Sequence, residues 1–406
     1  MRPCKELTQW QQFKYFCDIQ KDMKKSAGLI FFLFFFNLVG FACSYTEGML
    51  TDTVIPKDST KKSLYSKFTT IFKDKSFVIA PEIGEKPETG FSGGIYYLQV
   101  FQLSRNADSS TRKSNTESYL DYTAKRQILA QVKNNLIFKN ERFFIKGENF
   151  FNKFPDLFWG VGNQTTPEMQ QSISYNLLSI NQRFLGRLGS RYFAGLVYQY
   201  VNLNTVQYQK GGTLDTGKIS GAGGSITSGV GFDFLYDSRD NILNAYKGLY
   251  VEFSSLYNTP SLGGNHFFTN YTLDIRDFIN FGGRHVLALQ GLINYNQGDV
   301  PFRQMASIGG DMMMRGYYFG RFRDKLMLAA QAEYRFPVWK MIGLTAFVAV
   351  AEVAPDFAGL DLSDVHWTTG LCLRVMISKK ERLNMGIDSG IGYKTSGLYF
   401  NSGEAF

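Results

Sequence analysis

The stretch LMLAAQAEYRFPV, residues 326–338, decides the fold class. Every second residue is apolar or small, and this set comprises Leu326, Leu328, Ala330, Ala332, Tyr334, Phe336 and Val338. Gln331, Glu333 and Arg335 fall between them. Successive side chains of a strand point to opposite faces, whereas a helix repeats every 3.6 residues. The stretch therefore predicts a β-strand with one apolar face and one charged face.

The same alternation recurs along the chain, and residues 284–296, 365–377 and 382–393 give three further examples. A soluble β-sandwich would also alternate. Against a sandwich, the expected strands reach about 10 to 15 residues, whereas strands of soluble proteins average about five or six. Short turns at 282–283, 339–340 and 379–380 also alternate with long polar loops at 153–169, 207–221 and 297–321. This pattern is typical of a transmembrane barrel, with lipid outside and water inside.

We expect an all-β fold, a transmembrane antiparallel barrel of about 16 strands that occupies residues 76–406. Short turns then face the periplasm and long loops face outward, with both mature termini periplasmic, in the outer membrane of a Gram-negative bacterium. The expected strands are 76–83, 90–104, 116–123, 126–137, 141–152, 171–187, 190–206, 222–237, 247–258, 264–281, 284–296, 323–338, 342–354, 365–378, 382–394 and 397–406.

Residues 1–44 read as an N-terminal extension and a signal peptide. An apolar run at 27–42 follows Lys24 and Lys25 and precedes small residues, and it is short for the roughly 20 residues of a spanning helix. Met23 is the expected true start, because a basic region belongs at the beginning of a signal peptide. An uncleaved anchor and a lipidated Cys43 are the alternatives. Residues 45–75 form a short polar periplasmic segment.

Little in the sequence points to catalysis or to a cofactor. Cys4, Cys17 and Cys43 leave with the leader, so Cys372 remains without a disulfide partner. The three histidines have no metal-ligand spacing, and no phosphate-binding or nucleophile motif occurs. The formal charge of +9 is spread out and does not predict nucleic-acid binding. We expect no enzyme activity, no metal, no cofactor and no small-molecule substrate.

Three segments carry a resemblance to a known family. The loop segment MRGYYFGRF contains Arg315, Gly316 and Tyr317, and YDSRDNILNAYKGLYVEFS, residues 236–254, combines an acidic turn with a Lys-Gly pair. The last segment, RLNMGIDSGIGYKTSGLYFNSGEAF, ends on an aromatic. In this order the segments resemble the BamA/TamA superfamily of outer-membrane barrels, also called the bacterial surface antigen family. The likeness covers residues 81–406.

The resemblance implies roles for particular residues. The loop before the last five strands folds into the lumen, where Glu333, alone or together with Asp388, holds Arg315. Ala349 stands where the family often has a second acid, and Glu352 falls on the lipid side by parity. The expected periplasmic turn motif comprises Asp237, Arg239, Asp240 and Gly248. The expected C-terminal insertion signal comprises Phe400 and Phe406.

The resemblance also implies a function, namely insertion, assembly or translocation of outer-membrane or secreted proteins. The expected partners are outer-membrane lipid, the assembly machinery and nascent barrel or secreted proteins. About thirty residues separate the expected cleavage point from the first strand, too few for one of the family's periplasmic POTRA domains. A non-catalytic accessory subunit and a passive pore are the alternatives. Two weaker alternatives are a hydrolase that uses His366 and a calcium site formed by Asp233, Asp237 and Asp240.

Overall fold

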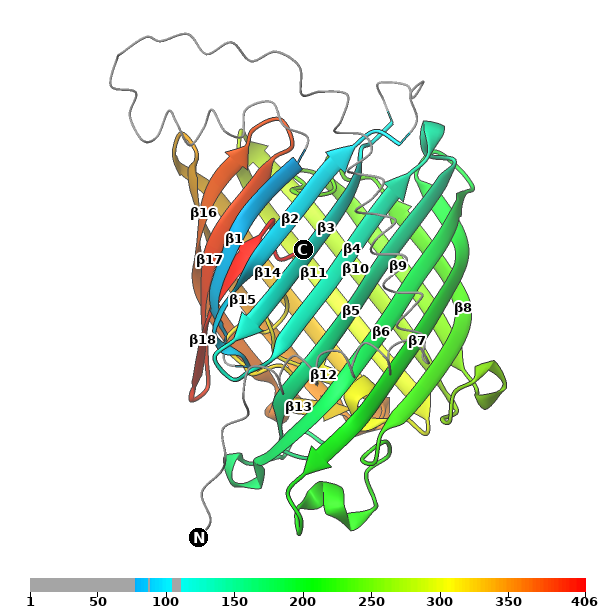
Figure 1. The fold of residues 1–406 in the computed structure, drawn as a ribbon. Helices are drawn as coiled ribbons and strands as arrows, with labels where there is room; N and C mark the ends of the chain where they lie inside the picture. Colours follow the sequence, from blue (N-terminus) through cyan, green and yellow to red (C-terminus); the bar gives the residue numbers. More distant parts are fainter. Residues whose placement is uncertain (1–76, 87, 104–110) are drawn as a thin grey trace, which may run out of the picture. The chain divides into compact units, whose positions relative to one another are not determined.

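The computed structural model in Figure 1 describes residues 77–86, 88–103 and 111–406. The chain divides into Met1–Ser63 and Leu64–Phe406, and all described residues belong to the second unit. The expected leader at 1–44 and the expected polar segment at 45–75 lie outside the described residues.

One antiparallel sheet of sixteen strands makes up the described fold, with strands paired in chain order. Its strands are β1 (Phe77–Lys86), β2 (Gly90–Phe101), β3 (Ser114–Thr123), β4 (Ile128–Ile137), β5 (Phe143–Phe158), β6 (Gln171–Arg187), β7 (Tyr192–Tyr208), β8 (Ser225–Asp237), β9 (Gly248–Asn258), β10 (Phe268–Gly282), β11 (His285–Gly298), β14 (Leu326–Trp339), β15 (Ile342–Ala354), β16 (His366–Ser378), β17 (Leu383–Gly392) and β18 (Thr395–Ser402). The expectation of about sixteen antiparallel strands is confirmed.

Short elements occupy the connections. Two three-residue strands, β12 (Ala306–Ile308) and β13 (Phe322–Asp324), pair with each other between β11 and β14. The 3-10 helices are η1 (Lys139–Glu141), η2 (Pro167–Met169), η3 (Thr213–Thr216), η4 (Pro260–Leu262), η5 (Phe302–Gln304), η6 (Phe357–Gly359) and η7 (Leu362–Asp364). Across the described ranges, none of the helices has both the length and the apolar character needed to cross a bilayer.

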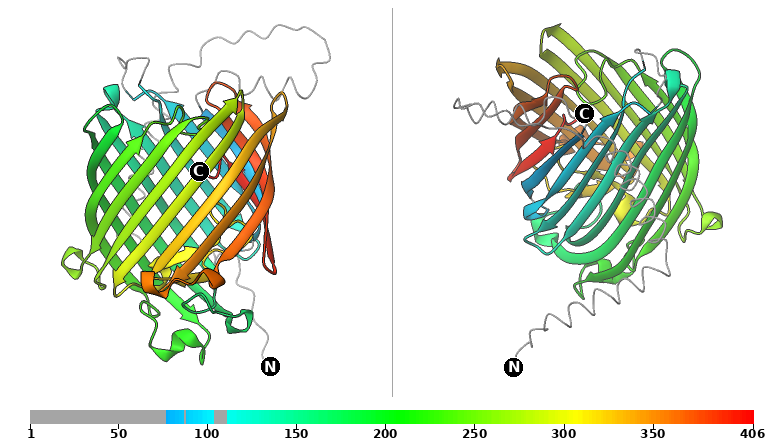
Figure 2. Two further views of the ribbon diagram at one scale, coloured as in Figure 1. Left: turned by 180° about the vertical axis from the view of Figure 1, so that it is seen from behind. Right: turned by 45° about the horizontal axis from the view of Figure 1, so that its top comes forward.

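The sheet curls into a barrel, as the views in Figures 1 and 2 show, and this brings the two ends of the strand order together. β1 lies beside β18. Within the described residues, however, the ladder of paired strands ends at β1 and at β18 and does not continue between them. We call this β1–β18 junction the seam. It is the one place in the described wall where two neighbouring strands do not share a ladder.

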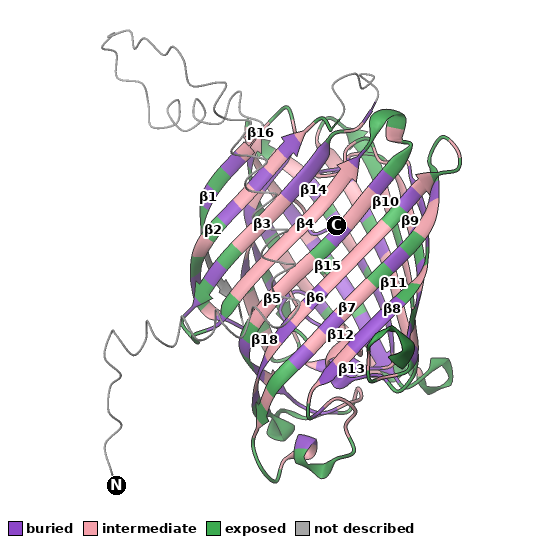
Figure 3. Ribbon diagram, turned by 45° about the vertical axis from the view of Figure 1, so that its right-hand side comes forward, coloured by how far each residue is buried: buried purple, intermediate pink, exposed green. Residues whose placement is uncertain are grey.

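Alternation along the strands separates an outer from an inner surface. On β8, Phe232 is 72% exposed while its neighbour Asp233 is 2% exposed. The alternating colours along the strands of Figure 3 show the same division. Along β8 the exposed outer positions carry apolar side chains, and Asp233 and Asp237 are buried on the inner side. This arrangement suits lipid outside and a polar interior.

The two ends of the barrel differ in their connections. We call the end with the β4–β5, β6–β7, β8–β9, β10–β11, β14–β15 and β16–β17 connections the turn end. The opposite end, which we call the loop end, carries the long connections that follow β5, β7, β9, β11 and β15. The 27 residues between β11 and β14, residues 299–325, include β12 and β13, and part of this loop lies inside the barrel.

Several expected strand bounds differ by a few residues, and the largest differences at C-terminal strand ends are those of β5 and β18. β5 continues through Pro155 to Phe158, because it pairs with β6 over its whole length, so the loop expected from residue 153 begins later. β18 ends at Ser402, whereas the expected last strand reaches residue 406. Gly403 adopts a positive φ of 80°, which turns the chain away from the strand direction. The buried residue Phe406 is therefore not part of the last strand.

The outer face gives a test of the membrane arrangement. Phe232→Arg places a charge on the apolar surface and should lower the stability of the barrel in lipid vesicles by about 2–4 kcal/mol. Gln199→Arg, a change on the inner face of β7, is the matched control and should have a much smaller effect. Urea unfolding in vesicles measures both. Equal stability of the two variants would contradict a lipid-facing outer surface.

Candidate functional site in the barrel lumen

The loop between β11 and β14 carries Arg315 into the interior of the barrel. The guanidinium is fully buried. Its Nη2 donates to Glu333 Oε1 of β14 at 2.5 Å, and its Nη1 donates to Asp388 Oδ2 of β17 at 2.8 Å. The guanidinium carbon also lies 3.8 Å from the ring centroid of Phe347 on β15. The loop tip thus contacts three strands of one arc of the wall, β14, β15 and β17.

Two further arginines complete the charge balance around Arg315. Arg335 donates to Glu333 Oε2 at 3.0 Å, and Arg374 donates to Asp388 and, at 3.0 Å, to Glu404 Oε2. Three arginines therefore face three carboxylates, Glu333, Asp388 and Glu404. Charges taken out of water are costly unless they are paired and hydrogen-bonded. Balanced pairing allows this cluster to be buried.

The loop backbone approaches the barrel wall so closely that one wall position requires glycine. A Cβ atom at Gly390 of β17 would lie 2.4 Å from the carbonyl oxygen of Arg315. The hydroxyl of Tyr399 on β18 accepts from the N–H of Gly316 at 2.9 Å. Thr395, also on β18, donates to the Gly316 carbonyl at 2.6 Å. The Arg-Gly pair is held at its side chain and at its backbone.

Apolar packing replaces the second acid that the family often has on β15. Ala349 is buried in a cluster with Met314 and Tyr317 of the loop. The second carboxylate for Arg315 comes instead from Asp388, two strands further along the sheet. Glu352 lies at an outward register position opposite Leu328 and accepts from the backbone N–H of Asp361 at 2.7 Å. It is not part of the arginine cluster.

A second attachment of the loop was missed by sequence reasoning. Tyr318 donates to Asp156 Oδ1 of β5 at 2.7 Å, and Tyr175 of β6 donates to Asp156 Oδ2 at 2.5 Å. Arg303, in the same loop, donates to the Tyr175 hydroxyl at 2.8 Å. Parity would have placed Asp156 inside, but the predicted loop began at residue 153. The loop is therefore fastened to opposite arcs of the wall.

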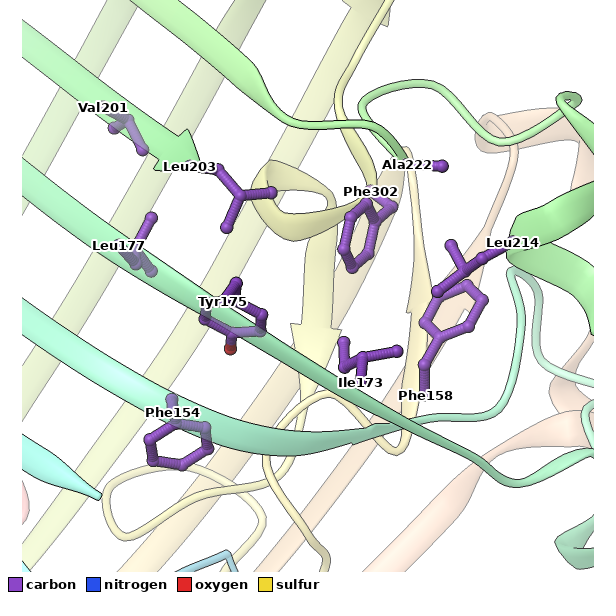
Figure 4. Packing of buried hydrophobic residues seen from close by; sticks show 10 residues of the cluster. All are labelled: Phe154, Phe158, Ile173, Tyr175, Leu177, Val201, Leu203, Leu214, Ala222 and Phe302. Carbon is purple, nitrogen blue, oxygen red and sulfur yellow. The ribbon is translucent and has the colours of Figure 1, made fainter. Parts of the chain in front are cut away.

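Aromatic packing fixes the start of the loop at the loop end. Figure 4 shows Phe302 among side chains from β5 to β7 and from the β7–β8 loop. The rings of Phe158 and Phe302 meet edge to face with centroids 5.3 Å apart. Such pairs contribute about 0.5–1.5 kcal/mol beyond burial. The loop between β11 and β14 is thus a packed part of the lumen.

The turn motif lies in the β8–β9 connection at the turn end. Asp237 accepts from Arg239, and Asp240 accepts from Arg382 at 2.7 Å. Gly248 has a φ of 116°, and a Cβ there would lie 2.5 Å from the Ser238 carbonyl oxygen. Although burial alone would raise the pKa of the Asp240 carboxyl, the hydrogen bonds from Arg382 and from two backbone N–H groups lower that pKa below its ordinary value.

The aspartates of the possible calcium site form ion pairs with arginines. Asp233 lies 2.6 Å from Arg183, and Asp237 lies 2.7 Å from Arg112. In the portion of the chain that the structure describes, no group of three or more potential ligands could hold a metal ion. These carboxylates therefore work as partners for arginine in the turn and in the lumen wall.

The two residues expected to form the C-terminal insertion signal lie on opposite sides of the wall. Phe400 occupies an outward register position on β18, opposite Ile387 of β17. Phe406 is buried in the interior, where it packs against Phe278 of β10 with ring centroids 6.1 Å apart. Arg335 donates to the Phe406 carbonyl at 3.0 Å. The structure does not bring the two residues together, and the insertion signal stays a prediction.

The histidines lack the geometry of a catalytic relay. His266 contacts both Asp299 Oδ2 at 2.7 Å and Ser220 Oγ at 3.3 Å, but through the same ring nitrogen, Nδ1. A relay needs the acid and the nucleophile on different nitrogens. His366 contacts the Asn163 side chain at 2.9 Å and stacks on Phe322. This arrangement gives a hydrolase reading at His366 no support.

Fold and site together define a class: an outer-membrane β-barrel whose lumen contains an inward-folded loop with a buried arginine. The Omp85 superfamily domain matches residues 113–406. The chain belongs to the Omp85 superfamily, which confirms the resemblance seen in its motifs. A comparison with curated proteins finds no match.

Solved structures with the same fold include three outer-membrane barrels. BamA from Haemophilus ducreyi lacking POTRA domains 1–3 aligns with a TM-score of 0.52 and 13% identity, over 81% of this chain and 70% of that one. CdiB from Acinetobacter baumannii aligns with a TM-score of 0.51 and 10% identity, over 80% of this chain and 59% of that one. CdiB from Escherichia coli aligns with a TM-score of 0.50 and 9% identity, over 80% of this chain and 62% of that one. At these identities the likeness concerns the fold.

The buried cluster predicts the cost of removing its central arginine. Arg315→Ala should lower the free energy of unfolding by about 3–5 kcal/mol, because Glu333 and Asp388 lose a buried partner. Lys133→Ala is the control, since Lys133 pairs with Glu148 in a partly exposed position and should matter by about 0–1 kcal/mol. Urea unfolding in vesicles measures both. Equal losses would refute the idea that Arg315 holds the loop.

The close approach at β17 predicts a second effect. Gly390→Ala should push the loop backbone away from the wall and destabilise the barrel by about 1–3 kcal/mol, as overpacking commonly does. Gly291→Ala is the matched control, because a Cβ at Gly291 would meet no atom within 4 Å. Protease sensitivity of the loop and the unfolding temperature report the difference. A tolerated Gly390→Ala would mean that the loop does not need this approach.

Proposed function

We propose that this protein acts in the insertion and assembly, or in the translocation, of outer-membrane or secreted proteins. The turn end and both mature termini then face the periplasm of a Gram-negative bacterium. The observation that carries the proposal is the seam. A barrel strand with a ladder on one edge only can pair with another strand through its second edge. An incoming strand paired with β1 or β18 would satisfy those groups as it enters the membrane.

The inward-folded loop supports a protein-handling role over a passive pore. Arg315 and Tyr318 attach the loop to β14 and β17 on one arc and to β5 on another. Segments fastened across the interior obstruct steady diffusion. A passive pore is the alternative. A pore predicts a steady conductance, and single-channel recording measures this.

The second candidate is a non-catalytic accessory subunit of an outer-membrane assembly complex. Its barrel would serve as a scaffold, with outer-membrane lipid around it and the assembly machinery as its partner. Purification from outer membranes in mild detergent separates the two roles. Recovery with a second, domain-bearing assembly barrel favours the subunit, whereas recovery as a monomer favours independent action.

Tethering the seam tests the main proposal. A bifunctional thiol reagent linking Ile79→Cys on β1 with Leu398→Cys on β18 should slow the folding of an unfolded barrel protein into vesicles that contain this protein. Both positions are exposed on the outside. The expected result is a folding rate close to that in vesicles without the protein, measured by the gel shift between folded and unfolded substrate.

The control tether joins Phe184→Cys on β6 with Leu196→Cys on β7. These residues are direct cross-strand partners with comparable exposure. Because their strands already share a ladder, this tether should leave the folding rate unchanged. Equal rates with the seam tethered and free would count against insertion through the seam.

A further inference from the structure

The connection between β8 and β9, residues 238–247, lies across the turn end and touches three arcs of the barrel wall. Ile242 packs against a cluster from β4 to β9. Ala245 is buried against Phe278 of β10 and Val286 of β11. Leu243 packs against a third cluster, which we treat separately. A turn needed only to join two adjacent strands would not require these long-range contacts.

Leu243 contacts a cluster drawn from both sides of the seam. One side contributes Val78 and Ala80 of β1 together with Leu98 of β2. The other side contributes Leu383, the first residue of β17. Since β1 and β18 share no ladder within the described residues, this apolar contact joins the two sides by another route.

Polar contacts of the same connection also reach both sides of the seam. Asp240 accepts from Arg382 of the β16–β17 turn at 2.7 Å, and Arg382 lies over the ring of Tyr246 at 4.2 Å. Asp237, which precedes the connection, accepts from Arg112 of the β2–β3 loop at 2.7 Å. Asn244 donates to Glu404 beyond β18 at 3.3 Å.

We propose that residues 238–247 are a clamp that holds the β1–β2 side and the β17–β18 side of the seam together from inside the barrel. Release of the Asp240–Arg382 pair then loosens the attachment of the clamp to the β17 side of the seam. The role of a parting seam rests on the proposed function, but the clamp itself is a property of the barrel.

The solvent exposure of the two ion pairs, Asp240–Arg382 and Arg315–Glu333, indicates which of them breaks more easily. The Asp240 and Arg382 side chains are 19% and 30% exposed, whereas those of Arg315 and Glu333 are fully buried. Ion pairs in contact with water are weak and are screened by salt. The clamp therefore opens while the lumen loop stays fastened, and high salt favours its opening.

The test is the distance across the seam. Nitroxide labels at Ile79→Cys and Leu398→Cys, with other accessible cysteines replaced by serine, report the distance by electron paramagnetic resonance in vesicles. Asp240→Asn removes the charge but keeps an oxygen for the backbone N–H groups of Tyr246 and Lys247. This variant, Arg382→Gln and Leu243→Ala should each shift the distribution to longer distances. The Asp240→Asn/Arg382→Gln double variant should shift it no further than one of its single changes.

Two controls decide what a shift means. Labels at Phe184→Cys and Leu196→Cys, on β6 and β7, should keep their distance in every variant. Glu148→Gln breaks the ion pair with Lys133 on β4 and should leave the seam unchanged. An unchanged seam in both Leu243→Ala and Arg382→Gln would overturn the clamp. Equal lengthening of both label pairs would also overturn it, because the connection would then stabilise the whole barrel.

The same experiment separates the clamp from the proposed function. If the seam parts in the clamp variants but neither they nor the wild type accelerate the folding of a substrate barrel, the clamp stands and insertion fails. If substrate folding depends on a free seam while the clamp variants keep the wild-type seam distance, insertion stands and the clamp fails.

Discussion

A polypeptide inside a bilayer must satisfy its backbone hydrogen-bonding groups by itself, because the hydrocarbon offers none. This constraint explains why strand pairs with strand in chain order through the described sheet, from β1 to β18. It also makes the seam significant. A junction without a ladder has a cost in lipid, so other contacts must hold it. The interior of the barrel supplies such contacts from the loop tip, from the β8–β9 connection and from residues 403–406.

The interior is organised around compensation of charge. Arg315, Arg335 and Arg374 face Glu333, Asp388 and Glu404, so that each charge has a partner in a space where an isolated one would be too costly. The same principle applies at the turn end, where arginines bind the acids of the β8–β9 connection. The two systems differ in exposure. The first is buried, whereas the Asp240–Arg382 pair of the second is partly exposed to water.

Much of the fold could be predicted because the side-chain period of a strand is two. Parity placed Glu333 and Asp388 on the polar face, and the alternation of short turns with long loops indicated an antiparallel barrel. The resemblance carried by the motif around Arg315 implied a loop inside the lumen. Parity failed at strand ends. The prediction ended β5 at residue 152, and Asp156, the acceptor for Tyr318, therefore fell in a predicted loop. The chain turns at Gly403, so β18 ends early and Phe406 lies in the interior. The prediction had placed this terminal aromatic residue on the last strand.

Away from the strand ends, the sequence by itself determined which residues are strand residues and which face each side chain occupies, because both depend on neighbours along the chain. The tertiary structure decided which carboxylates meet Arg315, since Glu333 and Asp388 lie 55 residues apart and come together only through the order of strands around the barrel. It also decided that residues 238–247 reach both sides of the seam. Contacts across the interior depend on barrel closure, and no local pattern encodes them.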